Sequence, residues 1–88
     1  MVAEKDVFNR VVEIICIKYP SAKITMDTYL EFNNNGEHLD MSSLEIVEFI
    51  LDLEREFDMI IDIEDRYYTV GDAVRGILLQ LNSEENNE

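Results

Sequence analysis

The segment from His38 to Phe57 reads HLDMSSLEIVEFILDLEREF and carries a strongly helical pattern. From position 46 onward, apolar side chains recur three or four residues apart: Ile46, Phe49, Ile50, Leu53 and Phe57. At about 100° per residue these side chains occupy one side of a helix, as expected for a stripe that packs on a core. We therefore predict a helix from Ser43 to Phe57, with Ser42 or Ser43 as its N-cap.

The same periodicity predicts a further helix on each side of this segment. The first spans roughly Glu4 to Tyr19 and ends at Pro20, which cannot continue a helix. The last begins at Val70 or Gly71, is capped by Thr69 and ends near Leu81. Three main helices are therefore expected.

The long connection over residues 21–40 is predicted to be a loop. Four apolar side chains are placed to pin it onto the core, namely Ile24, Met26, Leu30 and Phe32. The run NNNGE inside it favours a turn, because Asn and Gly tolerate left-handed backbone conformations. Loops of this length are unusual in small domains and often carry function.

The segment DMIIDIEDRYY, residues 58–68, is expected to form a short third helix of one or two turns. Its three isoleucines, Ile60, Ile61 and Ile63, are predicted to point inward. The predicted fold class is thus all-α, a small four-helix bundle of three main helices plus a short third one. Residues 1–82 are predicted to form one domain, and residues 83–88 an acidic, disordered tail.

Composition narrows the range of partners. The chain has 88 residues, of which 47% are apolar, which suits a single core. Its formal charge of -13 repels phosphate backbones and anionic membranes but attracts basic protein surfaces. The lone Cys16 permits no intramolecular disulfide and is expected to be a small buried side chain. Without a membrane-length apolar run or signal peptide, the expected location is the cytoplasm.

Catalytic and metal chemistry find little support in the sequence. A single His and a single Cys offer no spacing for a metal site, and DMIIDIED lacks the ligand pattern of a calcium loop. His38 is the only candidate base for a serine hydrolase, and a small bundle offers no evident oxyanion hole. We expect His38 to be a solvated loop residue.

A second apolar group lies beside the core stripe of the central helix. It consists of Leu44, Val47 and Leu51, and its borders are charged: Glu48, Glu54 and Arg55. Two interpretations stay open from the residues alone. The long loop covers this strip, or the strip is exposed and docks a partner that has an apolar recess with a basic rim.

The run LDMSSLEIVEFILDLEREFD resembles the acyl carrier protein family, whose second helix opens with Asp-Ser-Leu and ends in a similar acidic pattern. The run TVGDAV, Thr69 to Val74, resembles the opening of the family's last helix. The resemblance implies a non-catalytic carrier with a covalent 4'-phosphopantetheine arm on Ser43, with Ser42 as the less favoured site. A separate phosphopantetheinyl transferase would attach the arm, whose thiol would carry acyl groups between enzymes of fatty acid, polyketide or related biosynthesis.

The resemblance also assigns docking residues and a place for the cargo. The residues that it implies for partner binding are Leu44, Glu45, Val47, Glu48, Leu51 and Glu54. The expected partners are the transferase and acyl-processing enzymes with basic docking surfaces, and the chain is expected to be a monomer. Candidates to line an acyl shelter are Phe49, Ile50, Leu53, Ile61 and Ile77, for which ordinary core packing is an equal alternative.

The sequence departs from the family pattern at two residues and in the lengths of two segments. Ser42 stands where Asp usually precedes the modified serine, and Arg55 stands where many members carry an acid. The loop over FNNNGEHL is longer than usual, and the third-helix region is shorter. These departures indicate a specialised carrier. The alternative is an unmodified acidic interaction module of the same fold, which docks basic partners through the central helix.

Overall fold

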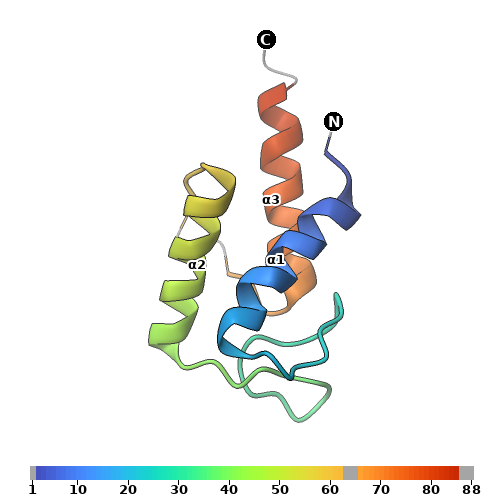
Figure 1. The fold of residues 1–88 in the computed structure, drawn as a ribbon, viewed down its shortest axis with the longest axis vertical. Coiled ribbons are helices and arrows are strands. Elements are labelled where there is room, and N and C mark those ends of the chain that lie inside the picture. Colours follow the sequence, from blue (N-terminus) through green and yellow to red (C-terminus); the bar gives the residue numbers. More distant parts are fainter. Residues whose placement is uncertain (1, 63–65, 86–88) are drawn as a thin grey trace.

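The computed structural model describes residues 2–62 and 66–85 and contains three helices in these ranges (Figure 1). They are α1, Glu4–Lys18; α2, Ser43–Phe57; and α3, Val70–Glu85. Both predicted ends of α2 are confirmed, and α1 ends one residue before the predicted Tyr19. Helix α3 continues through Glu85, past the predicted end at Leu81, so residues 83–85 of the predicted tail are helical.

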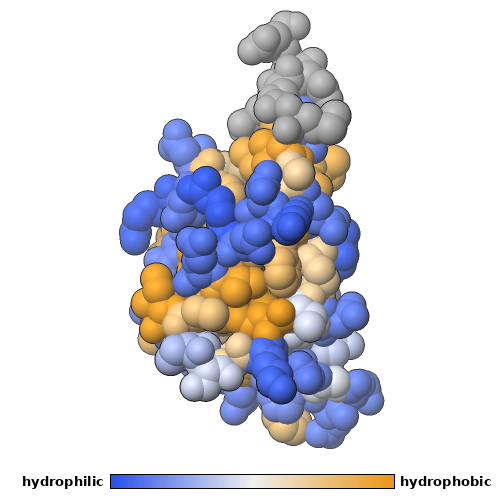
Figure 2. Space-filling model, turned by 45° about the vertical axis from the view of Figure 1, so that its right-hand side comes forward, coloured by the Kyte–Doolittle hydropathy of each residue, from blue (hydrophilic) through white to orange (hydrophobic). Residues whose placement is uncertain are grey.

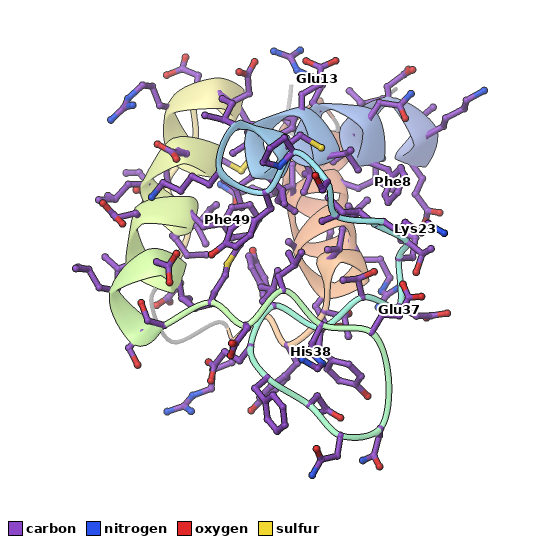
Figure 3. All side chains as sticks on the ribbon, turned by 60° about the horizontal axis from the view of Figure 1, so that its bottom comes forward. Phe8, Glu13, Lys23, Glu37, His38 and Phe49 are labelled. Atoms are coloured by element: carbon purple, nitrogen blue, oxygen red, sulfur yellow. The ribbon has the colours of Figure 1, made fainter. Side chains whose placement is uncertain are left out.

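The core forms where α1 packs against both α3 and α2. Each helix contributes apolar side chains to this core, and the buried ones are Val7, Val11, Ile15, Phe49, Leu53, Val70, Ala73, Val74 and Ile77. Figure 3 shows Phe49 pointing from α2 into the space between the helices. Cys16 is only partly buried. None of the three helices is long and apolar enough to cross a membrane.

A chain of this size cannot cover all of its apolar side chains. Several hydrophobic residues that pack on the core are only half-buried, among them Phe8, Ile14 and Ile46. Figure 2 accordingly shows an apolar region framed by hydrophilic side chains on the face that it presents. Exposed apolar surface by itself is therefore not a sign of function in this molecule.

The long connection between α1 and α2 is bonded through its backbone to the start of α3. Leu30 N–H donates to the Tyr68 carbonyl at 2.9 Å, and the Thr28 carbonyl accepts from Val70 N–H at the same distance. Leu30 is fully buried, and Ile24 and Met26 are half-buried, as predicted for pinning residues. The prediction for Phe32 is wrong. Phe32 is 61% exposed, because its ring lies in the loop tip against His38.

The segment after α2 does not form the predicted short helix in its described residues, 58–62 and 66–68, so the count of four helices is not confirmed. Asp58 ends α2 in the left-handed conformation, with φ of 51°. Beyond it Ile61 is buried, whereas Ile60 is 84% exposed, which corrects its predicted inward orientation. Successive side chains of a non-helical segment point in different directions, so only one of the two faces the core. Ile63 lies outside the described residues.

The start of α3 is held by a reciprocal pair of residues. Thr69 Oγ1 accepts from Asp72 N–H, and Asp72 Oδ2 accepts from the N–H groups of Thr69 and Tyr68. Burial alone would raise the pKa of Asp72, but these backbone hydrogen bonds, together with Arg75, lower it overall. The predicted cap at Thr69 is confirmed.

Candidate functional site

The start of α2 has a complete capping box, which decides between the two adjacent serines. Ser42 has extended backbone angles, and its Oγ accepts from Glu45 N–H at 3.2 Å. In return, Ser42 N–H donates to Glu45 Oε1 at 3.0 Å. Ser42 is therefore the N-cap, and Ser43 is the first residue of the helix.

Ser43 is exposed, and its hydroxyl makes no hydrogen bond to any described residue. The backbone N–H groups of Ser43 and Leu44 likewise have no acceptor within residues 2–62 and 66–85. Such N–H groups at the positive end of a helix favour a bound anion. The position thus combines an accessible hydroxyl with donors suited to a phosphate.

Glu45 connects this helix start to Tyr19, the residue that follows α1. The Tyr19 hydroxyl donates to Glu45 Oε2 at 2.6 Å. Partial burial, followed by the bond to Glu45 and the charge of that carboxylate, raises the pKa of Tyr19 to about 12. The bond from Tyr19, followed by those from the Ser42 backbone and side chain, lowers the pKa of Glu45. This carboxylate therefore helps to fix the orientation in which Ser43 is presented.

The apolar strip beside the core stripe is exposed, and the long loop does not cover it. Leu44, Val47 and Leu51 have exposed fractions of 69%, 47% and 51%. Of the two interpretations that the sequence leaves open, the structure supports the exposed strip. Leu44 directly follows Ser43, so the strip begins at the candidate attachment point. We call these three residues the docking strip.

The acidic side chains predicted to border the docking strip have contacts within the fold. Lys18 Nζ lies 3.1 Å from Glu48 Oε1, in an ion pair whose side chains are both half-exposed. Glu54 Oε2 accepts from Ile61 N–H at 2.7 Å and so holds the segment that follows α2. Glu45 lies on the side of α2 that faces Tyr19. The parts of Glu45, Glu48 and Glu54 in partner binding stay a prediction.

A groove of about 450 Å³ runs along α2 and shares Val47 and Leu51 with the docking strip. Its walls come from α2 and the segments around residues 31, 61–62 and 66–68, and its apolar lining is Ile46, Val47, Ile50, Leu51, Ile61, Tyr67 and Tyr68. Of the predicted shelter residues, Ile50 and Ile61 line this groove. The other three, Phe49, Leu53 and Ile77, are core residues that do not line it.

Sequence reasoning missed Ile46, Tyr67 and Tyr68 as groove residues. Ile46 belongs to the predicted apolar stripe, one turn before Ile50, and this spacing is a signal that identifies it. The two tyrosines line the groove because residues 66–68 lie beside α2. No pattern in the sequence indicates this position.

The contacts of His38 lie within the long loop. Its ring lies edge-on to Phe32 with centroids 4.8 Å apart, and its Nδ1 is 3.2 Å from the Gly36 carbonyl oxygen. Figure 3 shows it on the long loop. The contacts that the structure gives this imidazole thus do not include Ser43. The described residues also contain no cluster of three His, Cys, Asp or Glu side chains that could hold a metal ion.

Comparison with known proteins gives this geometry a family. No protein-family model matches the chain. It is 36% identical over 74 residues to an acyl carrier protein of Lactobacillus acidophilus, an alignment that covers 82% of this chain and 89% of that protein. It is also 36% identical over 78 residues to an acyl carrier protein of Lactobacillus johnsonii, with 84% and 91% covered. By sequence similarity over most of its length, and in agreement with its all-helical structure, the chain belongs to the acyl carrier protein family.

Proposed function

We propose that this protein is a non-catalytic carrier that shuttles thioester-linked acyl groups between separate enzymes of fatty acid, polyketide or related biosynthesis. Ser43 is the attachment point of a 4'-phosphopantetheine arm. The observation that carries the proposal is the exposed Ser43 hydroxyl, without a hydrogen bond to any described residue, at the first position of a capped helix in a chain of this family.

The residues around Ser43 suit a phosphodiester. The N–H groups of Ser43 and Leu44, which have no acceptor among the described residues, supply donors, and the helix dipole favours negative charge at the same place. When bound, the arm supplies a thiol on which an acyl group forms a thioester. The chain contributes an accessible oxygen and a fixed orientation, and the base that activates Ser43 comes from the transferase.

The departure at Ser42 leaves the capping function intact. Asp and Ser are both good N-caps, and Ser42 makes the bonds that a cap requires. Ser42 does not provide the negative charge of an Asp, so a transferase that contacts a charge at this position would bind the chain less well. We expect Ser42→Asp to keep the fold and to raise the efficiency of arm attachment.

The deciding experiment is intact mass after incubation with coenzyme A and a broad-specificity phosphopantetheinyl transferase. The wild type and Ser42→Ala should gain the mass of one arm, and Ser43→Ala should gain none. A wild type that stays unmodified, under conditions that load a control carrier, would count against the proposal. An arm on Ser43→Ala but not on Ser42→Ala would move the site to Ser42.

The alternative function is an unmodified acidic interaction module that docks partners through α2. The exposed docking strip is compatible with both functions, because it needs no arm. Two measurements distinguish these functions: partner binding by Ser43→Ala, and the intact mass of the wild-type chain purified from its native host. The alternative requires unchanged binding and a mass without an arm, whereas the carrier requires the arm on the wild type.

The groove that shares Val47 and Leu51 with the docking strip is the place that we propose for part of the cargo. Its apolar wall of Ile46, Ile50 and Ile61 would shield a short acyl chain from water. The remaining predicted shelter residues belong to a packed core, so the cargo would lie beside the core and not within it. Replacing Ile50 by Phe should reduce protection of a bound chain from thioester hydrolysis, compared with Ile60→Phe at an exposed position outside the groove.

A further inference from the structure

The charges of α2 are distributed unevenly between the fold and the solvent. All five of its acidic residues have partners within the described structure, namely Glu45, Glu48, Asp52, Glu54 and Glu56. The helix has a single basic residue, Arg55, and its side chain is 80% exposed. The most accessible charge on this helix is therefore positive, in a chain of net charge -13.

The weak internal contact of Arg55 leaves its charge available to a partner. Its one contact is with Asp52, three residues earlier, with a separation of 3.6 Å between Nη1 and Oδ1. An exposed pair at this distance contributes little, since water screens it and both side chains lose freedom. By contrast, Glu48 lies 3.1 Å from Lys18, and Glu54 accepts a backbone hydrogen bond.

Helical spacing places Arg55 in line with the docking strip. Leu44, Glu48, Leu51 and Arg55 stand at i, i+4, i+7 and i+11, which is a single row along the helix. Ser43 and Val47 lie in the neighbouring row. Arg55 is twelve residues from Ser43 and so about 18 Å along the axis, at the far end of the docking strip. A partner that covers the strip while it reaches Ser43 would also cover Arg55.

We infer that Arg55 is a specificity-determining residue of the docking strip, and that it selects partner enzymes that place a carboxylate opposite it. A partner with Lys or Arg at that point is disfavoured, because two like charges would be brought together as water leaves the interface. This inference rests on the proposed function, since it concerns enzymes that act on Ser43 or on what it carries. The docking surface of the partner enzyme is then expected to be basic around its rim except at one acidic position, which faces Arg55.

The overall charge and Arg55 act at different ranges. The net charge of -13 attracts basic proteins over a Debye length of about 8 Å or more at physiological salt. Arg55 acts only when the surfaces touch, and it therefore affects which encounters become productive. A control for the long-range field must consequently change the net charge by the same amount at a remote position.

Lys23 provides that matched control. It is an exposed cation of the long loop, and Figure 3 shows it on the side of the molecule away from α2. The substitutions Arg55→Glu and Lys23→Glu each change the net charge by the same amount. A difference between the two variants thus reports the local effect at Arg55.

The test uses coenzyme A and a phosphopantetheinyl transferase whose carrier-docking surface is basic. We expect Arg55→Glu to lower the KM for the carrier by about 3- to 10-fold, with kcat unchanged, because an opposing charge becomes an attractive one. Arg55→Ala should give an intermediate effect, and Lys23→Glu less than about 2-fold. Far-ultraviolet circular dichroism of each variant verifies the helical fold.

A charge exchange completes the test. A transferase variant with one Arg or Lys of its docking rim replaced by Glu, at the position facing residue 55, should prefer wild type over Arg55→Glu. Equal KM values for Arg55→Glu and Lys23→Glu with both transferases would overturn the inference. That result differs from failure of the proposed function, in which the wild type gains no arm while a control carrier does.

Discussion

The starts of α2 and α3 use the same capping chemistry but meet different surroundings. Ser42 with Glu45, and Thr69 with Asp72, both form reciprocal bonds between a hydroxyl residue and an acid three positions later. At α3, the next two N–H groups are taken by carbonyls of the long loop. Val70 N–H donates to Thr28, and Gly71 N–H donates to Met26 at 2.8 Å.

At α2, the equivalent N–H groups have no acceptor in the described part of the chain, and the first helical residue is exposed. Val70, which holds that position in α3, is fully buried. The comparison separates two uses of a helix start. One serves as a joint within the fold, and the other presents a hydroxyl and two backbone donors to solvent.

The largest expected difference comes from alanine at the first position of each helix. Val70→Ala leaves a cavity in the core and should lower the free energy of unfolding by about 2–3 kcal/mol. Ser43→Ala, at an exposed position, should change it by less than about 0.5 kcal/mol. Urea denaturation followed by circular dichroism measures both. Comparable losses would show that the start of α2 is also a structural joint.

The second position offers the next contrast. A Cβ added to Gly71 would lie 2.7 Å from the Met26 carbonyl oxygen, so the backbone of the loop would have to shift. Gly71→Ala should therefore cost about 1–3 kcal/mol. Leu44→Ala, at the second position of α2, should cost little because the side chain is exposed. Thermal unfolding of the two variants checks this, and an unaffected Gly71→Ala would contradict the close contact.

The two caps should be nearly equal in strength. Ser42→Ala and Thr69→Ala each remove one hydroxyl acceptor at a helix start, and each should cost about 1 kcal/mol. The free energies of unfolding from urea titrations test whether the similar geometry means similar stabilisation. A much greater loss at Thr69 would indicate that the loop around it adds to the cap.

The smallest expected effect is a difference between the two caps in how their contribution to stability depends on pH. The pKa values of Glu45 and Asp72 are lowered in the fold, so each contributes stability above its unfolded pKa near 4, which is lost as the pH falls through the lower folded value. At the start of α2, the acid of the cap is also bonded to Tyr19, whose pKa of about 12 is above its ordinary value near 10. Its contribution is complete below pH 10 and is lost as the pH rises toward 12.

Tyr19→Phe isolates this contribution. The variant should be less stable than wild type at pH 7 by no more than about 1 kcal/mol, because the pair is partly exposed. The difference should shrink between pH 10 and 11.5, as measured by urea unfolding of both proteins. A gap that stays constant over this range would indicate that the Tyr19–Glu45 bond contributes no stability.

The helices were predictable because their signals are local. The stripe from Ile46 to Phe57 and the serines before it define both ends of α2. The three-residue spacing of Ser42 and Glu45 also matches the capping box that identifies the N-cap. The exposure of Leu44 was not decided by the sequence, because it depends on the path of a distant loop.

The connections were less predictable, because their contacts join residues that are distant in the sequence. The bond between Thr28 and Val70 joins backbone groups that are distant in the sequence, and no side-chain pattern marks it. The predicted inward orientation of Ile60 belongs to a short helix that residues 58–62 and 66–68 do not form. The left-handed turn at Asp58 ends the helix and changes which side chains face inward.

The bonds of the long loop also limit how far the candidate attachment point moves. Met41 is buried, and its N–H donates to the Leu30 carbonyl at 2.8 Å, while Leu30 N–H donates to Tyr68. Ser43 thus stands two residues from a segment that is tied to the start of α3. For a group attached there, reach is set by the length of the group itself, since its base is stationary. Every enzyme that acts on the attached group would then need the same distance between the surface that contacts α2 and its reaction centre.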